Sequence, residues 1–135
     1  MKLLLFQAKS FSWKSFSKTL ETVPDQDVVE TIAEAVVVFL HAELEDEAKP
    51  KLETKLAKNI KWLANKRQLK NVVLHSFTHL SNSTASPEFA QTLLASLDLR
   101  LRETGYQVWQ TPFGYFCEWD LSVYGDSLAK VFKEL

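Results

Sequence analysis

The sequence predicts a single α/β domain, residues 1–135, made of a small mixed sheet with helices packed on it. Two short runs rich in β-branched and apolar residues, 35–42 and 71–77, have the length and composition of buried strands. Between them apolar residues recur at helical spacing, so the order is strand, helix, strand. The length suits one domain with one core, and no repeat or Gly/Ser-rich linker divides the chain.

The first elements follow in order. KLLLF near the N-terminus is typical of a strand, and AVVVFLHA (35–42) is typical of a second strand that is covered on both faces. An apolar residue at every third or fourth position marks the first helix: Leu52, Leu56, Ile60 and Leu63. NVVLHSF (71–77) completes the unit as another buried strand, for which a right-handed crossover is expected.

The second helix is marked at both ends. Ser86 suits the N-cap, Pro87 the first helical position, and Gly105 the residue that closes the helix. Its apolar stripe consists of Phe89, Leu93, Leu94, Leu97 and Leu101.

The last part of the chain predicts two strands and a short helix. YQVWQ (106–110) and YFCEWDLSV (115–123) flank Pro112-Phe113-Gly114, a pattern that predicts two strands joined by a tight turn. A short C-terminal helix starting near Asp126 or Ser127 is predicted from the spacing of Leu128, Val131, Phe132 and Leu135.

Composition excludes several classes of protein. Cys117 is the only cysteine, so there is no disulfide framework and no four-ligand zinc site. The apolar run in MKLLLF is too short for a signal sequence or a membrane span, because polar Gln7, Lys9 and Ser10 follow at once. We therefore expect a cytoplasmic protein without a membrane partner.

Charge is unevenly distributed although the net charge is only −1. The segment 49–70 is strongly basic and holds one acid, Glu53, whereas 43–47 is acidic. The basic residues are Lys49, Lys51, Lys55, Lys58, Lys61, Lys66, Arg67 and Lys70. Two interpretations stay open, a local contact with a phosphate backbone and an ordinary solvated helix face.

The segment HSFTHLSNSTASPEFA (75–90) leads from a buried strand into a helix N-terminus. Ligands in open α/β sheets bind at that kind of position, because strand ends leave a crevice lined by free backbone groups. The Ser and Thr hydroxyls of the segment are equally suited to turns and helix capping. A ligand site and a purely structural loop are both compatible with the pattern.

No catalytic side chain is evident. His75 and His79 would need a third ligand to bind a metal, and His41 is the only other histidine. Cys117 with His79 would form a nucleophile and its base, whereas a free cysteine in an aromatic strand is more often a small buried apolar residue. Neither a Gly-rich phosphate loop nor a nucleophile elbow is present. The sequence indicates a pocket without a metal or cofactor.

Two stretches, FTHLSNSTASPEFAQTLLASL (77–97) and TPFGYFCEWDLSVYGDSLA (111–129), together resemble the archaeal threonyl-tRNA synthetase editing domain. The matching features are Phe-x-His-Leu-Ser, a Pro after a polar spacer, and a Pro-Phe-Gly-Tyr turn. The resemblance extends to the N-terminal strand and ELEDEAKP (43–50), and so through nearly the whole chain. It implies a D-aminoacyl-tRNA deacylase-like fold that pairs as a homodimer.

The resemblance also implies a function. The protein would be a proofreading hydrolase that removes L-serine from the acceptor end of tRNA(Thr), with a threonyl-tRNA synthetase catalytic body in cis or in trans. The terminal ribose hydroxyl would help to activate the attacking water, and the pocket would exclude threonine. The alternative is a non-catalytic amino-acid or tRNA binding module of the same fold.

The implied site combines two segments of the chain. The residues expected to bind substrate are Ala42, Ser76, Phe77, Thr78, His79, Gly114, Tyr115, Phe116 and Cys117. Those expected to take part in catalysis are Phe77, Thr78, His79, Cys117 and Lys130, the first three through backbone N–H groups that bind the developing oxyanion.

Two positions depart from the family pattern. Cys117 stands where a strand lysine is expected, and Lys130 stands where an acidic residue is usual. We hypothesise that the Lys130 ammonium reaches the same space from the C-terminal helix, so that the charge has changed its carrier. The alternative is that neither position matters to the chemistry.

Overall fold

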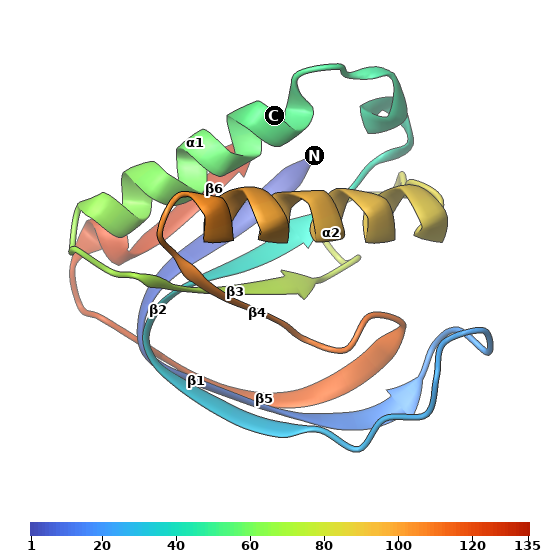
Figure 1. Ribbon diagram of the computed structural model, residues 1–135, viewed down its shortest axis with the longest axis horizontal. Coiled ribbons are helices and arrows are strands. Elements are labelled where there is room, and N and C mark those ends of the chain that lie inside the picture. Colours follow the sequence, from blue (N-terminus) through green and yellow to red (C-terminus); the bar gives the residue numbers. More distant parts are fainter.

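The computed structural model describes residues 1–135 and contains one six-stranded mixed sheet with two helices (Figure 1). The strands are β1 (Lys2–Lys18), β2 (Val29–His41), β3 (Asn71–Ser76), β4 (Gln107–Gln110), β5 (Tyr115–Val123) and β6 (Lys130–Glu134). The helices are α1 (Leu52–Asn65) and α2 (Pro87–Glu103), with 3-10 turns at Leu44–Ala48 and Ser127–Ala129. The strand order is β4-β3-β2-β1-β5, and β6 also pairs with β1. The predicted fold class is confirmed.

Both helices lie on one face of the sheet (Figure 1). Because β2, β3 and β4 are parallel neighbours, α1 and α2 are the crossover helices that connect them. Leu56 and Ile60 of α1 and Leu97 of α2 are buried against the even-numbered side chains of β2. The predicted capping of α2 is confirmed: the Ser86 hydroxyl accepts a hydrogen bond from the Phe89 N–H at 3.2 Å.

The other face of the sheet curls around a second, smaller core. Val37, Phe39 and Val73 point into it, together with Phe11 and Trp13 from the far half of β1. Glu34 adopts a positive φ of 48°. On its C-terminal side the odd-numbered Val37 and Phe39 face this core, whereas on its N-terminal side the even-numbered Ile32 faces it. The side chains therefore change faces at Glu34, which curls the far ends of β1 and β2 under the sheet (Figure 1). β1 is much longer than the predicted strand KLLLF, because its second half continues into the curled part and pairs there with β5.

The predicted pairing of the two late strands is wrong. β4 and β5 form as strands, but they lie at opposite ends of the strand order rather than side by side. β4 pairs in parallel with β3, and the Thr111 N–H donates to the Leu74 carbonyl at 3.1 Å. The segment 111–114 therefore crosses from one edge of the curled sheet to the other, and it helps to enclose a cavity between them.

The predicted C-terminal helix is also wrong. Residues 130–134 form β6, which pairs antiparallel with residues 2–6 of β1. Val131 and Leu135 pack against the main core, while Phe132 stays 52 % exposed, as the alternation of a strand requires. A helix of so few residues is hard to nucleate, whereas the open edge of β1 offers backbone partners at once. Neither helix is long and apolar enough to cross a membrane.

Candidate functional site

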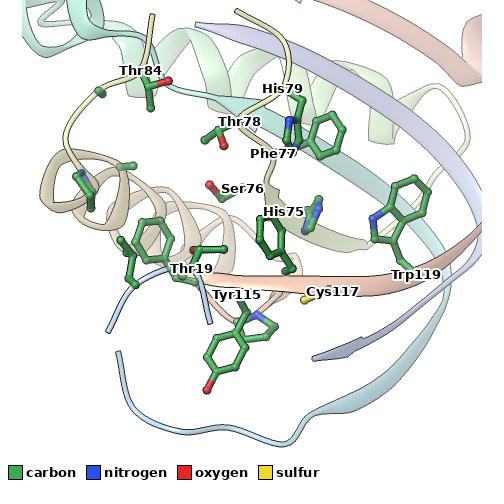
Figure 2. A pocket seen from close by; sticks show the side chains of 18 residues that line it. Thr19, His75, Ser76, Phe77, Thr78, His79, Thr84, Tyr115, Cys117 and Trp119 are labelled. Atoms are coloured by element: carbon green, nitrogen blue, oxygen red, sulfur yellow. The ribbon is translucent and has the colours of Figure 1, made fainter. Parts of the chain in front are cut away.

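A cavity of about 400 Å³ opens where β3 ends, in the position that the loop at 75–90 predicts (Figure 2). It lies between the 77–86 loop and the first turn of α2 on one side, and the 112–114 turn, β5 and the end of β1 on the other. We call it the cleft. Its lining residues are Thr19, Leu20, His75, Ser76, Phe77, Thr78, His79, Thr84, Ala85, Pro87, Ala90, Pro112, Phe113, Gly114, Tyr115, Phe116, Cys117 and Trp119. The structure thus brings eight of the nine predicted binding residues together; Ala42 is the exception.

The cleft lining contains no Lys, Arg, Asp or Glu. Its polar groups are hydroxyls, backbone groups, two imidazoles, the Trp119 indole N–H and the Cys117 thiol, set among aromatic and small apolar side chains. An anionic ligand group would find no Lys or Arg side chain to replace its water here, whereas hydroxyl and carbonyl oxygens can accept hydrogen bonds from a cationic one. The cleft therefore disfavours a carboxylate.

Part of the 77–86 loop is held from below by a buried histidine. His41 is fully buried, and its Nδ1 accepts a hydrogen bond from the Leu80 N–H at 3.0 Å. The proton of the neutral ring must then be on Nε2, which lies 3.1 Å from the Thr84 hydroxyl and donates to it. His41 is thus a structural residue that ties Leu80 and Thr84 of the loop together.

The loop hydroxyls divide into two groups. Ser81 donates to the Glu43 carboxylate at 2.6 Å, Ser83 bonds the Glu45 carboxylate, and Ser86 caps α2. Ser76 and Thr78, by contrast, line the cleft and make no side-chain hydrogen bond within the protein. The structural interpretation therefore holds for Ser81, Ser83 and Ser86, whereas Ser76 and Thr78 stay available to a ligand.

The backbone donors differ from the expectation for Phe77. Its N–H donates to the Leu40 carbonyl at 2.9 Å, so this group is not free for an oxyanion. The N–H groups of Thr78 and His79 make no hydrogen bond within the protein. These two groups remain available to a ligand.

The turn at 112–114 is fixed against the end of β1. Gly114 adopts a φ of +77°, and its carbonyl accepts from the N–H groups of Thr19 at 2.7 Å and Leu20 at 3.3 Å. The Tyr115 hydroxyl accepts from the Gln26 N–H at 2.7 Å and donates to the Pro24 carbonyl at 3.0 Å. Tyr115 therefore clamps the β1–β2 loop, and its hydroxyl points away from the cleft (Figure 2).

The β5 wall of the cleft is apolar. Trp119 is 41 % exposed and packs edge-on against Phe39, with ring centroids 5.2 Å apart. Burial raises the pKa of the Cys117 thiol, and no hydrogen bond joins its sulfur to either His75 or His79. A thiol in this state is a poor nucleophile. The structure places Cys117 in the wall without the base that a cysteine mechanism needs.

Two predicted site residues lie outside the cleft. Ala42 is buried in the main core below the loop, where its carbonyl accepts from the Ala85 N–H at 2.9 Å. Lys130 pairs with Phe6 at the start of β6, whereas Cys117 pairs with Ser15, nine residues further along β1. The Lys130 ammonium donates to the Tyr124 carbonyl at 3.0 Å. Lys130 therefore does not take the place of a lysine at Cys117, because no C-terminal helix carries it toward the cleft.

His75 is the main residue that the expected binding and catalytic sets missed. It lies 5 % exposed on β3, and its Nδ1 lies 2.8 Å from the Thr111 hydroxyl. Burial lowers its pKa to about 4, so the imidazole is neutral at pH 7. The available signal was its alternation with Val73 at a spacing of two, which places it on the curled face that leads into the cleft.

The basic run at 49–70 forms a solvent-facing stripe. Lys55 and Lys58 are exposed on α1, on the side away from the buried Leu56 and Ile60, and Lys51 is exposed just before the helix. None of these lysines lines the cleft. Both interpretations of the run therefore stay open.

The fold and site define a class of protein. The chain has the D-aminoacyl-tRNA deacylase-like fold, and over its full length it is similar to the solved structure titled "c-Myc DNA Unwinding Element Binding Protein", with a TM-score of 0.71 and 17 % sequence identity; 99 % of that chain is covered. Within this class, the chain belongs to the family described as the archaea-specific editing domain of threonyl-tRNA synthetase, which matches residues 1–135.

Full-length relatives support this assignment. The chain is 31 % identical to the "Threonine--tRNA ligase" of Methanosphaera stadtmanae and 30 % identical to that of Thermococcus kodakarensis, in each case over 100 % of the chain. It is 32 % identical to that of Hyperthermus butylicus over 97 % of the chain. The chain spans 22 % of the length of each of these relatives.

Proposed function

We propose that the protein is an aminoacyl-tRNA deacylase that removes L-serine wrongly attached to tRNA(Thr). The observation that supports this most is the absence of any charged Lys, Arg, Asp or Glu side chain from the cleft lining. A free amino acid would bring a carboxylate that requires a cationic partner. In an aminoacyl ester that carboxylate has become a neutral ester. Only the α-ammonium keeps its charge, and hydroxyl and carbonyl oxygens can accept its N–H groups, so an esterified amino acid suits this cleft better than a free one.

This argument separates the proposal from its alternative, a non-catalytic module that senses a free amino acid. Such a module would bury the α-carboxylate against Arg, Lys or a helix N-terminus. The α2 N-terminus borders the cleft, but the Ser86 hydroxyl already accepts from the Phe89 N–H of its first turn. The free-ligand alternative predicts tighter binding of serine than of a serine ester, and the deacylase predicts the reverse.

The chemistry needs no side-chain nucleophile from this chain. The ribose hydroxyl next to the ester would assist the attack of water, and the protein would hold water and ester in a reactive geometry. Positioning of this kind can supply ~7–11 kcal/mol of a reaction barrier. The unpaired N–H groups of Thr78 and His79 would donate to the oxyanion as charge develops on the ester oxygen. The free hydroxyls of Ser76 and Thr78 would hold the water or the ribose.

The need for such a site follows from the similarity of serine and threonine. They differ by one methyl group, which allows the aminoacylation site of a synthetase to select threonine over serine by only about 10- to 200-fold. A second site that is too small for the extra methyl completes the selection by steric overlap. Ala85 and Ala90, with Phe113 opposite, are rigid apolar groups of the cleft that could provide this overlap.

The proposal extends to partners. The substrate would be the acceptor end of tRNA(Thr) carrying serine, and the relatives indicate a threonyl-tRNA synthetase catalytic body as the companion, in cis or in trans. A cytoplasmic location fits that companion, and a homodimer is the assembly we expect from the family resemblance.

The direct test is single-turnover release of labelled amino acid from seryl-tRNA(Thr) and threonyl-tRNA(Thr). We expect serine to be released at least about tenfold faster than threonine. Release of both at equal rates, or of neither, would overturn the proposal.

A blocking variant tests whether the reaction occurs in the cleft. Ala90→Trp on α2 places a large ring in the cleft and should abolish serine release. The matched control is Gln91→Trp, because Gln91 is exposed on the same helix and does not line the cleft. Equal activity of the two variants would place the reaction elsewhere.

The cysteine-dependent esterase is the other candidate that the sequence allowed. It requires that Cys117→Ala abolish activity, whereas the substrate-assisted reaction requires that serine release survive this change. The raised pKa of Cys117 and its lack of a histidine partner argue for survival.

A further inference from the structure

The His75–Thr111 pair is a buried polar pair that joins β3 to the start of the 111–114 segment beside the cleft. His75 is 5 % exposed and Thr111 is 7 % exposed, and only His75 lines the cleft. Nδ1 of His75 lies 2.8 Å from the Thr111 hydroxyl, which has no other hydrogen-bond partner. The Thr111 hydroxyl therefore holds the imidazole in one orientation.

The second nitrogen of His75 has no partner in the protein. Nε2 makes no hydrogen bond, and it is not sealed from solvent, since Trp13 Nε1 is the only solvent-inaccessible side-chain nitrogen or oxygen without a partner. Because the rest of the ring is buried and His75 borders the cleft, the accessible Nε2 must face the cleft. Figure 2 shows His75 among Phe77, Cys117 and Trp119, which all line the cavity.

The rings around His75 fix its plane and keep it uncharged. Phe39 lies 4.8 Å from it and Phe77 6.0 Å, centroid to centroid. No Asp or Glu carboxylate lines the cleft that could stabilise an imidazolium, and burial lowers the pKa of His75 to about 4. The ring therefore offers one neutral hydrogen-bonding atom inside an aromatic wall.

We propose that Nε2 of His75 binds the side-chain hydroxyl of the amino acid in the cleft, and that Thr111 is the positioning residue that orients this nitrogen. The inference rests on the proposed function, since it assigns a subsite within the same cleft. It makes His75 a specificity residue that selects for a hydroxyl, in addition to the steric limit that excludes a methyl group.

A hydroxyl is the group that fits this nitrogen in either tautomer. If the Thr111 hydroxyl donates to Nδ1, Nε2 carries the proton and donates to the ligand. If Nδ1 donates to Thr111, Nε2 accepts. A hydroxyl both donates and accepts, whereas an ammonium only donates and a methyl group does neither. Once a ligand covers Nε2, serine would satisfy this nitrogen, and alanine would leave it buried without a partner.

The test compares ligands that differ only in this hydroxyl. Stable amide mimics of 3′-seryl-adenosine and 3′-alanyl-adenosine are titrated against the protein, and hydrolysis of seryl- and alanyl-tRNA(Thr) is measured alongside. We expect the wild type to prefer the seryl compound by roughly 10- to 100-fold in both assays, because an unsatisfied buried polar group is costly.

The variants assign this preference to the pair. His75→Phe should bring the seryl/alanyl ratio to within about threefold, by weakening the seryl compound while the alanyl compound is unchanged or improved. His75→Gln, which keeps a polar end at similar reach, should retain part of the ratio. Thr111→Val should lower the ratio by roughly 3- to 10-fold, because the ring loses its orienting bond. Thr31→Val is the control, since its hydroxyl pairs with Ser12 on the exposed face of the sheet.

The outcomes separate the two proposals. If the wild type binds the seryl mimic but hydrolyses neither tRNA, the deacylase proposal fails and the subsite still stands on the binding ratio. If His75→Phe weakens both mimics equally, or leaves the ratio intact, His75 has only a structural role and the inference is overturned. If His75→Phe does not fold, as judged by circular dichroism, Thr111→Val decides: an unchanged ratio overturns the inference.

Discussion

Replacing Gly114 by alanine should disturb the cleft through backbone strain and a steric clash at one position. Gly114 has a φ of +77°, which an L-residue adopts at a cost of roughly 1–2 kcal/mol. A Cβ built there would lie 2.8 Å from Val23 Cγ1 and 3.3 Å from Leu20 Cβ. The first distance is too short for two carbon atoms, so the β1–β2 loop has to move, at a further cost of roughly 1–3 kcal/mol. The sum is a loss of about 2–5 kcal/mol in the free energy of unfolding.

The matched control is Gly105→Ala. Gly105 also has a positive φ, 97°, but a Cβ there meets no atom within 4 Å. This variant should lose only the backbone part, roughly 1–2 kcal/mol. The difference between the two variants therefore isolates the clash with the β1–β2 loop.

Urea denaturation followed by circular dichroism measures both variants, and the double variant Val23→Ala with Gly114→Ala completes the set. Because Val23 supplies the nearest atoms, its truncation should recover roughly 1 kcal/mol or more of the Gly114→Ala loss. The reasoning is refuted if Gly114→Ala is no less stable than Gly105→Ala, or if truncating Val23 recovers nothing.

Three further predictions concern the residues around the cleft. Tyr115→Phe removes the hydroxyl that joins the Gln26 N–H and the Pro24 carbonyl, and it should lower the free energy of unfolding in urea by roughly 1 kcal/mol; an unchanged value would contradict the clamp. Hydrogen bonds from the Met1 amino group, which has the largest effect, and from the Ser81 hydroxyl lower the pKa of Glu43 to about 2 from the ordinary value of 4.5. Because folding lowers this pKa, the ionised carboxylate stabilises the fold fully above pH 4.5, and this stabilisation is lost as the pH falls from 4.5 toward 2. In thermal melts, Glu43→Gln should therefore lose less stability over this pH interval than the wild type. Equal losses of stability in the two proteins would contradict the prediction. Lys130→Ala should leave serine release within about twofold of the wild type, since its ammonium bonds backbone carbonyls outside the cleft; a tenfold loss would return Lys130 to the mechanism.

The site was readable from the sequence where local chemistry determines it. Ser86 and Pro87 define the start of α2 in any context, so the position of the loop before it followed directly. The end of a buried strand is a usual position for a ligand crevice, and the cleft opens there beside Phe77. The ordered pair of motifs then indicated that the 112–114 turn faces this loop, which no spacing rule would have shown.

The errors arose where pairing between distant segments decides the structure. The pattern around Gly114 resembles a hairpin, but the open edge of β3 takes residues 107–110 as a parallel neighbour, and the turn becomes a crossing between two sheet edges. The spacing of Val131 and Phe132 suits a helix, but the edge of β1 takes this segment as a strand. Because a C-terminal helix was expected, Lys130 was predicted to lie at the cleft, but on β6 it lies outside the cleft. The partners of the Ser81 and Ser83 hydroxyls and of the buried His75 became visible only in the structure.

The central claim is that the cleft positions the ester while the tRNA supplies part of the chemistry, and one measurement tests it most directly. Single-turnover hydrolysis is compared for two preparations of 3′-linked seryl-tRNA(Thr), one ending in ribose and one ending in 2′-deoxyribose, at saturating protein. The account predicts that the deoxy substrate still binds but is hydrolysed at least about 100-fold more slowly, because no group in the cleft replaces the missing hydroxyl. Equal rates for the two substrates would contradict the account and require a catalytic group from the protein.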